Sequence, residues 1–250
     1  MGMTPEDIPL EVLYEDEHLL VVNKPAGMVV HPTYRNASGT VMNGLLQRAL
    51  DWPAWQRPSL VNRLDKATSG LVVVARSADL HARLQRVFSS SVTEKDYLAV
   101  VYGVVAEGHG AIDLRLSHDP GDRRRILASP TAGAESLTRF ERIASVPAPR
   151  VGLSLLRCRL LTGRTHQIRV HLAARGWPIV GDPMYGEPRW TDIGDPPLAA
   201  VLREFPRQAL HAWRTAFTHP ATAARVVLHA PLPDDIVQLL NAACLRQPCV

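Results

Sequence analysis

The stretch that decides the fold reads Val61-Asn62-Arg63-Leu64-Asp65-Lys66-Ala67-Thr68-Ser69-Gly70, and it runs directly into Leu71-Val72-Val73-Val74-Ala75. The second part is a short run of aliphatic, mostly β-branched residues, which is typical of a strand buried in a sheet. The Thr-Ser-Gly segment before it predicts a turn. Asp65 therefore lies on a tight connection into a rigid strand, where its carboxylate can be held in place.

Asp65 has two interpretations. An aspartate before a turn commonly accepts hydrogen bonds from the local backbone and has no other role. Alternatively, the arginine two residues earlier and the strand behind the turn fit a carboxylate that is positioned for chemistry. This stretch alone does not choose between a turn-forming and a catalytic Asp65.

Length and composition indicate a folded protein of one large domain or two small ones. Of 250 residues, 46% are hydrophobic, which is enough for a large core. A mean hydropathy of −0.04 and the lack of any apolar run of about 18 residues exclude a membrane span. Met1 to Pro9 has no basic or apolar segment of a signal peptide. A cytoplasmic location is expected, because the cysteines have no metal-ligand spacing and fit free thiols. These are Cys158, Cys244 and Cys249.

The distribution of charge predicts a polyanionic partner. The net charge is only +4, but residues 1–18 contain six acids and no Lys or Arg. Of the 28 basic residues 25 are arginines, which suit phosphate contacts and stacking on bases. A GC-rich genome would explain the total number of arginines but not their clustering. Val151 to Gly181 contains five arginines and no acid, and Arg123-Arg124-Arg125 is a second cluster.

Hydrophobic periodicity predicts one α+β domain. Strands are expected over 11–16, 19–24, 71–75, 94–103, 123–128, 135–143, 151–161, 210–217 and 225–229, mainly antiparallel because their connections are short. Helices are expected over 40–50 with Thr40 as N-cap, after Ser77 through Phe88, over 165–175 with Thr165 as N-cap and Gly176 as stop, over 198–205 and over 234–245. Residues 108–121 are expected to be irregular.

The helix expected over 165–175 carries a second candidate group. Ile168 and Leu172 form its buried stripe, whereas His166 and Arg169, three residues apart, share another face. Arg169 could pair with Asp65 and keep that carboxylate ionised at neutral pH. The ordinary alternative for a helical arginine is a solvated helix face.

Other chemistries find little support in the sequence. His166 and His171 are about 140° apart on a helix and cannot share a metal, and neither HxxxH nor CxxC occurs. No glycine-rich phosphate-binding loop occurs between a predicted strand and a predicted helix. Asp65-Lys66-Ala67-Thr68 lacks the Thr-Gly-Thr of an aspartyl-phosphate motif. We therefore expect neither a metal nor a cofactor.

Five segments, taken in order, resemble the RluA-type pseudouridine synthases over residues 10–235. They are Lys24-Pro-Ala-Gly27 with Val30-His31-Pro32; Arg63-Leu64-Asp65-Lys66-Ala67-Thr68-Ser69-Gly70; Lys95 to Gly103; Gly163-Arg164-Thr165-His166-Gln167-Ile168-Arg169-Val170-His171 with Gly181-Asp182-Pro183-Met184-Tyr185-Gly186; and Leu210-His211-Ala212 through Pro220. The resemblance implies the pseudouridine synthase fold, a mixed, mainly antiparallel bent sheet flanked by helices and loops, with a central active-site cleft.

The resemblance also implies a reaction and roles. Enzymes of this family isomerise uridine within RNA by breaking the N-glycosidic bond, turning the uracil over and forming a carbon–carbon bond, without cofactor or metal. Asp65 would be the catalytic carboxylate, Tyr97 would lie against the base and assist late proton transfer, and Arg169 would pair with Asp65. Further residues expected to bind substrate are Lys24, Asn62, Arg63, Leu64, Arg164, Gln167 and Leu210.

Two departures from the family pattern bear on the choice of RNA. Asn62 stands where many members have His, and the chain begins at the first core strand, without the small N-terminal RNA-binding domain of some members. We expect a single catalytic domain over 1–250, with a core of about 10–240, acting as a monomer on ribosomal RNA or, alternatively, transfer RNA. Selection would then fall to loops 31–39, 104–125 and 186–208. A catalytically silent RNA-binding protein on the same scaffold is the alternative.

Overall fold

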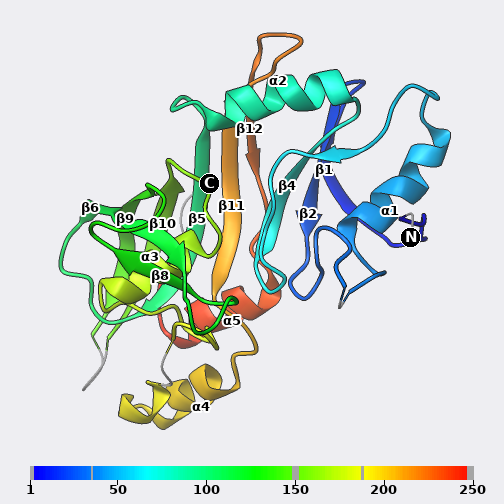
Figure 1. Cartoon of the computed structure of the whole chain (residues 1–250). Coiled ribbons are helices and arrows are strands. Elements are labelled where there is room, and N and C mark those ends of the chain that lie inside the picture. The colour runs from blue at the N-terminus through cyan, green and yellow to red at the C-terminus, as the bar shows by residue number, and fades with distance from the viewer. Residues whose placement is uncertain (1–2, 35, 148–151, 187–188, 247–250) are drawn as a thin grey trace. The chain divides into compact units, whose positions relative to one another are not determined.

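The computed structural model describes residues 3–34, 36–147, 152–186 and 189–246. The chain forms two compact units. Unit 1 comprises Met1–Glu94 and Ala212–Pro231, and unit 2 comprises Lys95–His211 and Leu232–Val250. Each unit has its own strands and helices (Figure 1). The expectation of a single catalytic domain stays a prediction.

Unit 1 is built on a sheet in which β4 is central. Its strands are β1 (Glu11–Glu15), β2 (Leu19–Lys24), β3 (Ser59–Leu60), β4 (Ser69–Ala75), the part of β11 (Leu210–Thr218) from Ala212 onward, and β12 (Arg225–His229). The order is β1-β2-β4-β11, with β3 on β4 and β12 on β11. The pairs β1–β2, β2–β4, β3–β4 and β11–β12 are antiparallel.

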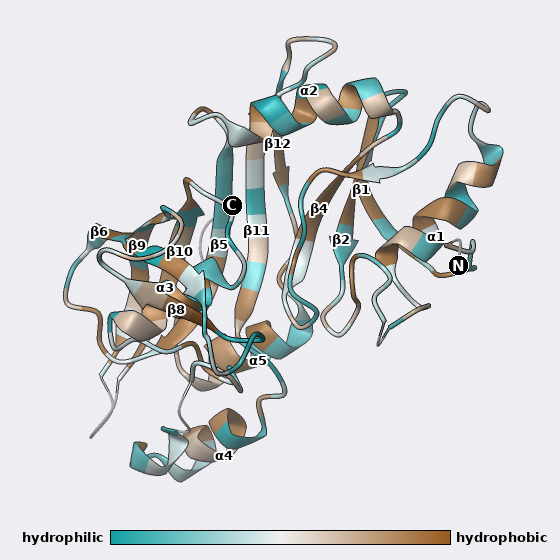
Figure 2. Cartoon of the chain, viewed as in Figure 1, coloured by the Kyte–Doolittle hydropathy of each residue, from teal (hydrophilic) through white to brown (hydrophobic). Residues whose placement is uncertain are grey.

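β4 is buried on both faces, as its aliphatic run predicts. Leu71, Val73 and Ala75 belong to a core cluster with the apolar face of α2 (Ala78–Ser89). The alternate residues Val72 and Val74 pack in a second cluster with α1 (Val41–Arg48). The apolar colouring of β4 in Figure 2 follows this double burial. The predicted N-caps of these helices, Thr40 and Ser77, are confirmed, and a short 3-10 turn, η1 (Ala49–Asp51), follows α1.

Unit 2 is built on an antiparallel sheet in the order β5-β10-β9-β6. Its strands are β5 (Glu94–Tyr102, of which Glu94 belongs to unit 1), β6 (His109–Asp113), β9 (Leu137–Val146) and β10 (Leu153–Leu160), and β7 (Arg115–His118) and β8 (Ile126–Ser129) form a separate hairpin. Its helical segments are α3 (Gln167–Ala174), η2 (Trp190–Asp192), α4 (Pro196–Glu204) and α5 (Asp234–Ala242). The prediction of an α+β fold with mainly antiparallel pairing is confirmed.

Two local predictions are wrong. Residues 108–121, expected to be irregular, contain β6 and β7. Helix α3 begins at Gln167 rather than Thr165, and its N-cap is His166, which has a left-handed φ of 56° and makes no side-chain capping bond. The predicted stop at Gly176 is confirmed by its φ of 78° and its backbone bond to Ala173.

Of the chemistry-bearing residues in the described part of the chain, Cys158 and Cys244 are free thiols, and Cys249 lies outside the described residues. Among the described residues no helix is long and apolar enough to cross a membrane.

Candidate active site

The loop that carries Asp65 is fastened to β4 by Asn62. The Asn62 Nδ2 donates to the carbonyl of Leu71 at 3.1 Å, and its Oδ1 accepts from the Val73 amide at 2.7 Å. The side chain therefore extends the ladder of β4 by two hydrogen bonds, as a neighbouring strand would. Asn62, which we predicted to bind substrate, thus holds the loop, and any effect on RNA would act through the position of that loop.

Lys24 secures the same loop from the other side. Its side chain is fully buried, and Nζ donates to the carbonyls of Pro25, Met28 and Lys66 at 2.8, 2.9 and 3.1 Å. The Gly27 amide adds a bond of 2.8 Å to the Lys66 carbonyl. All three protons of the ammonium are used, so the predicted part of Lys24 in substrate binding would be indirect, through the loops that it joins.

The three residues Arg63, Leu64 and Asp65 have different environments. Arg63 is exposed, Leu64 packs against the core cluster beneath α1, and Asp65 is half-buried. The Asp65 carbonyl accepts from the Thr68 amide at 3.0 Å, so the predicted turn is present. The main chain of Asp65 closes the turn, and this backbone role is compatible with a separate, chemical role for the carboxylate.

Gly70 places this turn against β11 within unit 1. Its φ is 112°, and a Cβ built there would lie 2.2 Å from the carbonyl oxygen of Ala212. Only glycine permits both the backbone conformation and this close approach. The sequence Thr-Ser-Gly is therefore a steric requirement for the position of the Asp65 loop.

A histidine lies in the electrostatic field of this loop. His31 is partly buried, and burial together with the positive charge of Arg63 lowers the pKa of its imidazole. His31 is consequently a neutral group beside a cationic one at neutral pH. Lys66 adds a second positive charge on the exposed side of the loop.

In unit 2 the central feature is a buried pair between Arg169 of α3 and Asp182. Arg169 Nε and Nη2 donate to the two carboxylate oxygens at 2.6 and 2.9 Å, and the arginine is only 5% exposed. Burial alone would raise the pKa of Asp182, but bonds from Arg169 and from the amides of Met184 and Tyr185 lower it. The interpretation of Arg169 as a solvated helix residue is therefore wrong.

Asp182 is the residue that our sequence reasoning missed. It lies in the predicted loop Gly181–Gly186, thirteen residues after Arg169, and no periodicity links the two. Its only sequence signal is an aspartate between a glycine and a proline, which is also typical of an ordinary turn. Asp65 belongs to unit 1 and Arg169 to unit 2. Their predicted pairing stays a prediction, as does the position of Tyr97 beside the base.

An aromatic group extends the Arg169 pair. The Arg169 guanidinium carbon lies 5.1 Å from the centre of the Tyr185 ring. The Tyr185 hydroxyl accepts from the Ile126 amide and contacts His166 Nδ1, both at 2.8 Å. Arg169 is thus held by a carboxylate and by an aromatic ring, which fixes its orientation on α3.

Gln167 and Arg164, both predicted to bind substrate, have different environments. The Gln167 amide donates to the Leu137 carbonyl and the Thr138 hydroxyl, and its oxygen accepts from the Thr162 hydroxyl and the Arg164 amide. Gln167 is buried, and its side chain ties the start of α3 to β9 and to the turn before the helix. Arg164 is exposed, so of the two predicted substrate-binding residues it is the one placed to reach RNA.

The remaining predicted site residues of unit 2 are on strands. Tyr97 is half-buried on β5, directly opposite Cys158 of β10, and Leu210 is buried at the start of β11. Burial, with a contribution from Asp96, raises the pKa of the Cys158 thiol to about 12. Cys158 therefore stays a neutral thiol, which does not suit it to act as a nucleophile.

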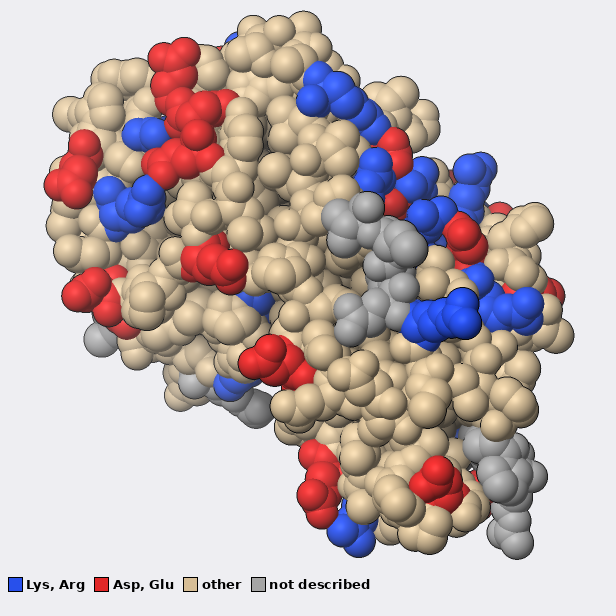
Figure 3. All heavy atoms as spheres, turned by 180° about the vertical axis from the view of Figure 1, so that it is seen from behind, with Lys and Arg blue, Asp and Glu red and all other residues tan. Residues whose placement is uncertain are grey.

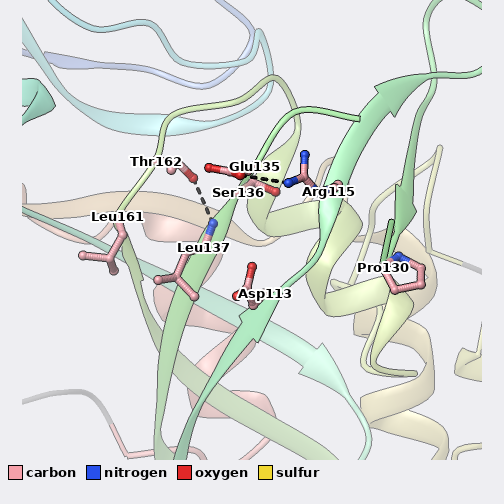
Figure 4. Close-up of a pocket in the computed structure, with 8 residues that line it drawn as sticks. All are labelled: Asp113, Arg115, Pro130, Glu135, Ser136, Leu137, Leu161 and Thr162. Carbon is pink, nitrogen blue, oxygen red and sulfur yellow. Dashed lines mark hydrogen bonds and ion pairs between the residues drawn. The ribbon is translucent and has the colours of Figure 1, made fainter. Parts of the chain in front are cut away.

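A cavity of about 470 Å³ lies beside the turn before α3 (Figure 4). Its charged lining is Asp113, Arg115 and Glu135, of which Arg115 pairs with Glu135 at 2.8 Å. The Thr162 hydroxyl on its rim accepts from the Leu137 amide at 3.0 Å. The other lining residues are Pro130, Ser136 and Leu161. Within the described residues no group of three or more His, Cys, Asp or Glu side chains has the arrangement of a metal site.

The arginines of Val151–Gly181 are less available to a polyanion than their spacing indicates. Four of the five pair with carboxylates from other segments of unit 2. The pairs are Arg157–Glu141, Arg159–Asp96, Arg169–Asp182 and Arg175–Glu107. On the face in Figure 3, Lys and Arg side chains crowd together on one side with acids among them. The exposed arginines include Arg63, Arg123, Arg139 and Arg164.

Comparison with known proteins relates the sequence of this chain to one family. A family model described as RNA pseudouridylate synthase matches residues 18–174. The chain is 46% identical over 242 residues to Ribosomal large subunit pseudouridine synthase D of Xylella fastidiosa, a match that covers 95% of this chain and 70% of the relative. It is 42% identical over 243 residues to the protein of that name in Pseudomonas aeruginosa, covering 97% and 73%.

Two solved human structures have the same fold. RNA Pseudouridylate Synthase Domain Containing 4 superposes with a TM-score of 0.75 at 23% identity, covering 96% of this chain and 95% of that one. RNA Pseudouridylate Synthase Domain Containing 1 gives a TM-score of 0.71 at 25% identity, covering 94% and 87%. Sequence and fold agree: the chain belongs to the RNA pseudouridylate synthase family, the enzymes that isomerise uridine to pseudouridine within RNA.

Proposed function

We propose that this enzyme converts uridines of large-subunit ribosomal RNA to pseudouridine, with Asp65 as the catalytic carboxylate. The substrate is inferred from the relatives, which carry the name ribosomal large subunit pseudouridine synthase D at 46, 44 and 42% identity. One observation supports Asp65 above the other acids of unit 1. Its loop is built into β4 by Asn62, Lys24 and Gly70, which is the rigidity that a catalytic group needs.

The chemistry requires one carboxylate and no further reagent. Breaking the N-glycosidic bond develops positive charge on the ribose, which an ionised Asp65 would stabilise, or trap by attack on the anomeric carbon. Removal of a neighbouring ribose proton is a third route for the same group. The uracil, detached at N1, then rotates, and its C5 bonds to C1′ of the ribose as any Asp65–C1′ bond breaks or any abstracted ribose proton returns. C5 loses its proton to solvent and N1 takes one up, so the reaction is a net isomerisation.

Arg169 and Tyr97 are proposed to complete the site. Arg169 would keep Asp65 ionised and oriented, while its bonds to Asp182 hold the guanidinium in place. Tyr97 would lie against the uracil and Leu210 would pack near it. The partly exposed Tyr97 ring on a well-paired strand suits a rigid contact with a base.

RNA binding is proposed to use the exposed arginines of both units. Arg63 is adjacent to the Asp65 loop and Arg164 precedes α3. Arginines at such positions would hold the phosphates on either side of a uridine that leaves its stack, a step that costs a few kcal/mol. RNA affinity should therefore fall steeply as salt rises. A flat salt response would contradict this part of the proposal.

The decisive experiment compares Asp65→Asn with Asp79→Asn. Asp79 is a largely exposed carboxylate on α2 of the same unit, 3.8 Å from Arg83, and serves as the matched control. Ribosomal RNA labelled with tritium at uracil C5 releases tritium on conversion. Asp65→Asn should release none and keep the wild-type circular dichroism spectrum, while Asp79→Asn should match the wild type. Turnover by Asp65→Asn would remove Asp65 from the mechanism.

Three further properties belong to the same proposal. We propose ribosomal rather than transfer RNA as substrate, a cytoplasmic location and a monomeric enzyme. Mapping of pseudouridines in both RNA classes from a strain without this protein tests the first. Fractionation of cells and sedimentation of the purified enzyme test the other two. A wild-type enzyme that binds RNA but converts no uridine would instead support a silent RNA-binding protein.

A further inference from the structure

Tyr34 is a large aromatic side chain that the fold of unit 1 leaves in solvent. Its relative exposure is 103%, whereas the next most exposed aromatic residue of the described chain, Trp55, is 70% exposed. A single exposed ring is common on protein surfaces and by itself indicates nothing. The contacts of the turn that carries Tyr34 distinguish this ring from an ordinary exposed one.

The ring lies on a tight turn with a defined shape. Thr33 and Asn36 on either side of it exchange two backbone hydrogen bonds of 2.9 and 3.0 Å. The Thr33 hydroxyl also accepts from the backbone amide and side-chain amide of Asn36, at 3.2 and 3.4 Å. Tyr34 thus directly follows a residue whose backbone and hydroxyl are both hydrogen-bonded to Asn36.

The turn is attached to the Asp65 loop. Asn36 Oδ1 accepts from Lys66 Nζ at 3.1 Å, and Lys66 is the residue directly after Asp65. The Lys66 carbonyl is in turn held by Lys24 at 3.1 Å. The hydrogen bond between the side chains of Lys66 and Asn36 therefore connects the turn that carries Tyr34 to the residue next to Asp65.

The charges around the turn complement RNA. Lys66, which bonds to Asn36 of the turn, is exposed. Arg63 is also exposed, and its positive charge acts on His31, three residues before Tyr34. An exposed aromatic ring flanked by cations is the arrangement by which proteins bind unpaired nucleotides, with stacking for the base and positive charge for the phosphate. An apolar protein partner would instead require a continuous apolar patch.

We propose that Tyr34 stacks on an unpaired base of the RNA next to the target uridine. This inference rests on the proposed function, because it takes Asp65 as the position of the target. A uridine that turns out of its helix leaves neighbouring bases without their stacking partner. The Tyr34 ring would replace that partner, and it would stabilise the bound RNA equally in the ground state and in the transition state.

The experiment measures steady-state kinetics on ribosomal RNA, and RNA affinity in an Asp65→Asn background. Tyr34→Ala should raise KM and Kd by roughly 5- to 150-fold, the range for loss of one aromatic–base stack. Its kcat should change by less than about twofold, because uniform binding is removed. Tyr34→Phe keeps the ring and should bind like the parent.

Trp55→Ala is the matched control. Trp55 is also exposed, but it precedes Arg57, whose amide bonds to the Arg76 carbonyl at the opposite end of β4 from Ser69. Ser69 and Ala75, the ends of β4, are six residue steps apart, which corresponds to about 20 Å. Trp55→Ala should leave both KM and Kd unchanged.

The outcomes separate the two proposals. A wild type that converts no uridine overturns the proposed function, and the Kd comparison still tests Tyr34 against RNA. An active wild type with unchanged Kd and KM in Tyr34→Ala overturns the stacking role alone. Equal losses in Tyr34→Phe, or in Trp55→Ala, would also overturn it, since the effect would then not come from this ring.

Discussion

Replacing Asp182 by Asn tests how firmly unit 2 depends on its buried ion pair. Asn has nearly the same shape, so the change removes the charge and leaves the volume. Arg169, only 5% exposed, would keep its positive charge with a neutral partner. Removing one member of a buried pair costs about 3–5 kcal/mol, and an amide oxygen that still accepts one bond favours the lower end of this range.

The expected loss converts to a melting temperature. At about 2–4 °C per kcal/mol for a chain of this size, Asp182→Asn should melt roughly 6–20 °C below the wild type at neutral pH. The difference should depend on acidity with a definite sign. The pKa of Asp182 is lowered in the folded state, so its contribution is complete above the unfolded value of about 4 and is lost as pH falls through the folded value. The two melting temperatures should therefore converge below about pH 4.

A matched control lies in the same unit. Arg124 donates to both oxygens of Asp122, at 2.9 and 2.7 Å, with the same two-bond geometry but on the surface. Asp122→Asn should leave the melting temperature unchanged, because solvent screens an exposed pair. Thermal unfolding followed by circular dichroism measures both variants. If Asp182→Asn melts within about 1 °C of the wild type, the buried pair does not stabilise unit 2 and the argument fails.

Three other changes test single contacts. Gly70→Ala should yield insoluble or strongly destabilised protein, because the new Cβ would lie 2.2 Å from the Ala212 carbonyl oxygen, whereas Gly163→Ala, with open space around it, should fold normally in a solubility assay. Lys24→Met should lower the free energy of unfolding by at least about 2 kcal/mol in urea titration, since the carbonyls of Pro25 and Met28 lose this donor while the Lys66 carbonyl keeps its bond from the Gly27 amide. Burial lowers the pKa of His171, so wild-type stability should decline as pH falls below about 6.5, and His171→Gln should decline less between about pH 7.5 and 5.5 by the same titration.

Much of the fold could be predicted because the local signals agree with the tertiary structure. The aliphatic run of β4 predicts a strand buried on both faces, and the packing of Val72 and Val73 into different clusters confirms it. Thr40 and Ser77 are strong N-cap residues followed by periodic apolar residues, and both cap helices. In such segments propensity, pattern and burial favour the same structure.

The wrong predictions have tertiary causes. Gly110 weakens the strand signal of β6, yet a Cβ at this position would lie 2.7 Å from the Phe140 ring on β9, so the strand needs glycine there. Thr165 resembles an N-cap, but α3 begins two residues later, where the buried Gln167 side chain bonds to the Arg164 amide and to Thr138 of β9. Neither contact can be inferred from neighbouring residues.

The candidate site divides in the same way. The turn after Asp65 is local and could be predicted, whereas the role of its carboxylate stays a prediction. The partner of Arg169 could not, because Asp182 reaches it through the folding of the loop after α3. The cluster of arginines in 151–181 predicted a surface for a polyanion, but four of these five arginines pair with acids from other segments.

The buried ammonium of Lys24 has a consequence for how the enzyme tolerates its surroundings. Three carbonyl oxygens, two from the turn after β2 and one from the Asp65 loop, converge on one positive centre, which is the task that a bound calcium or potassium ion performs in other loops. Here the cation is covalently part of the chain. It cannot be chelated, exchanged or diluted. The geometry around Asp65 should therefore be unchanged at salt concentrations high enough to abolish binding of the RNA phosphates.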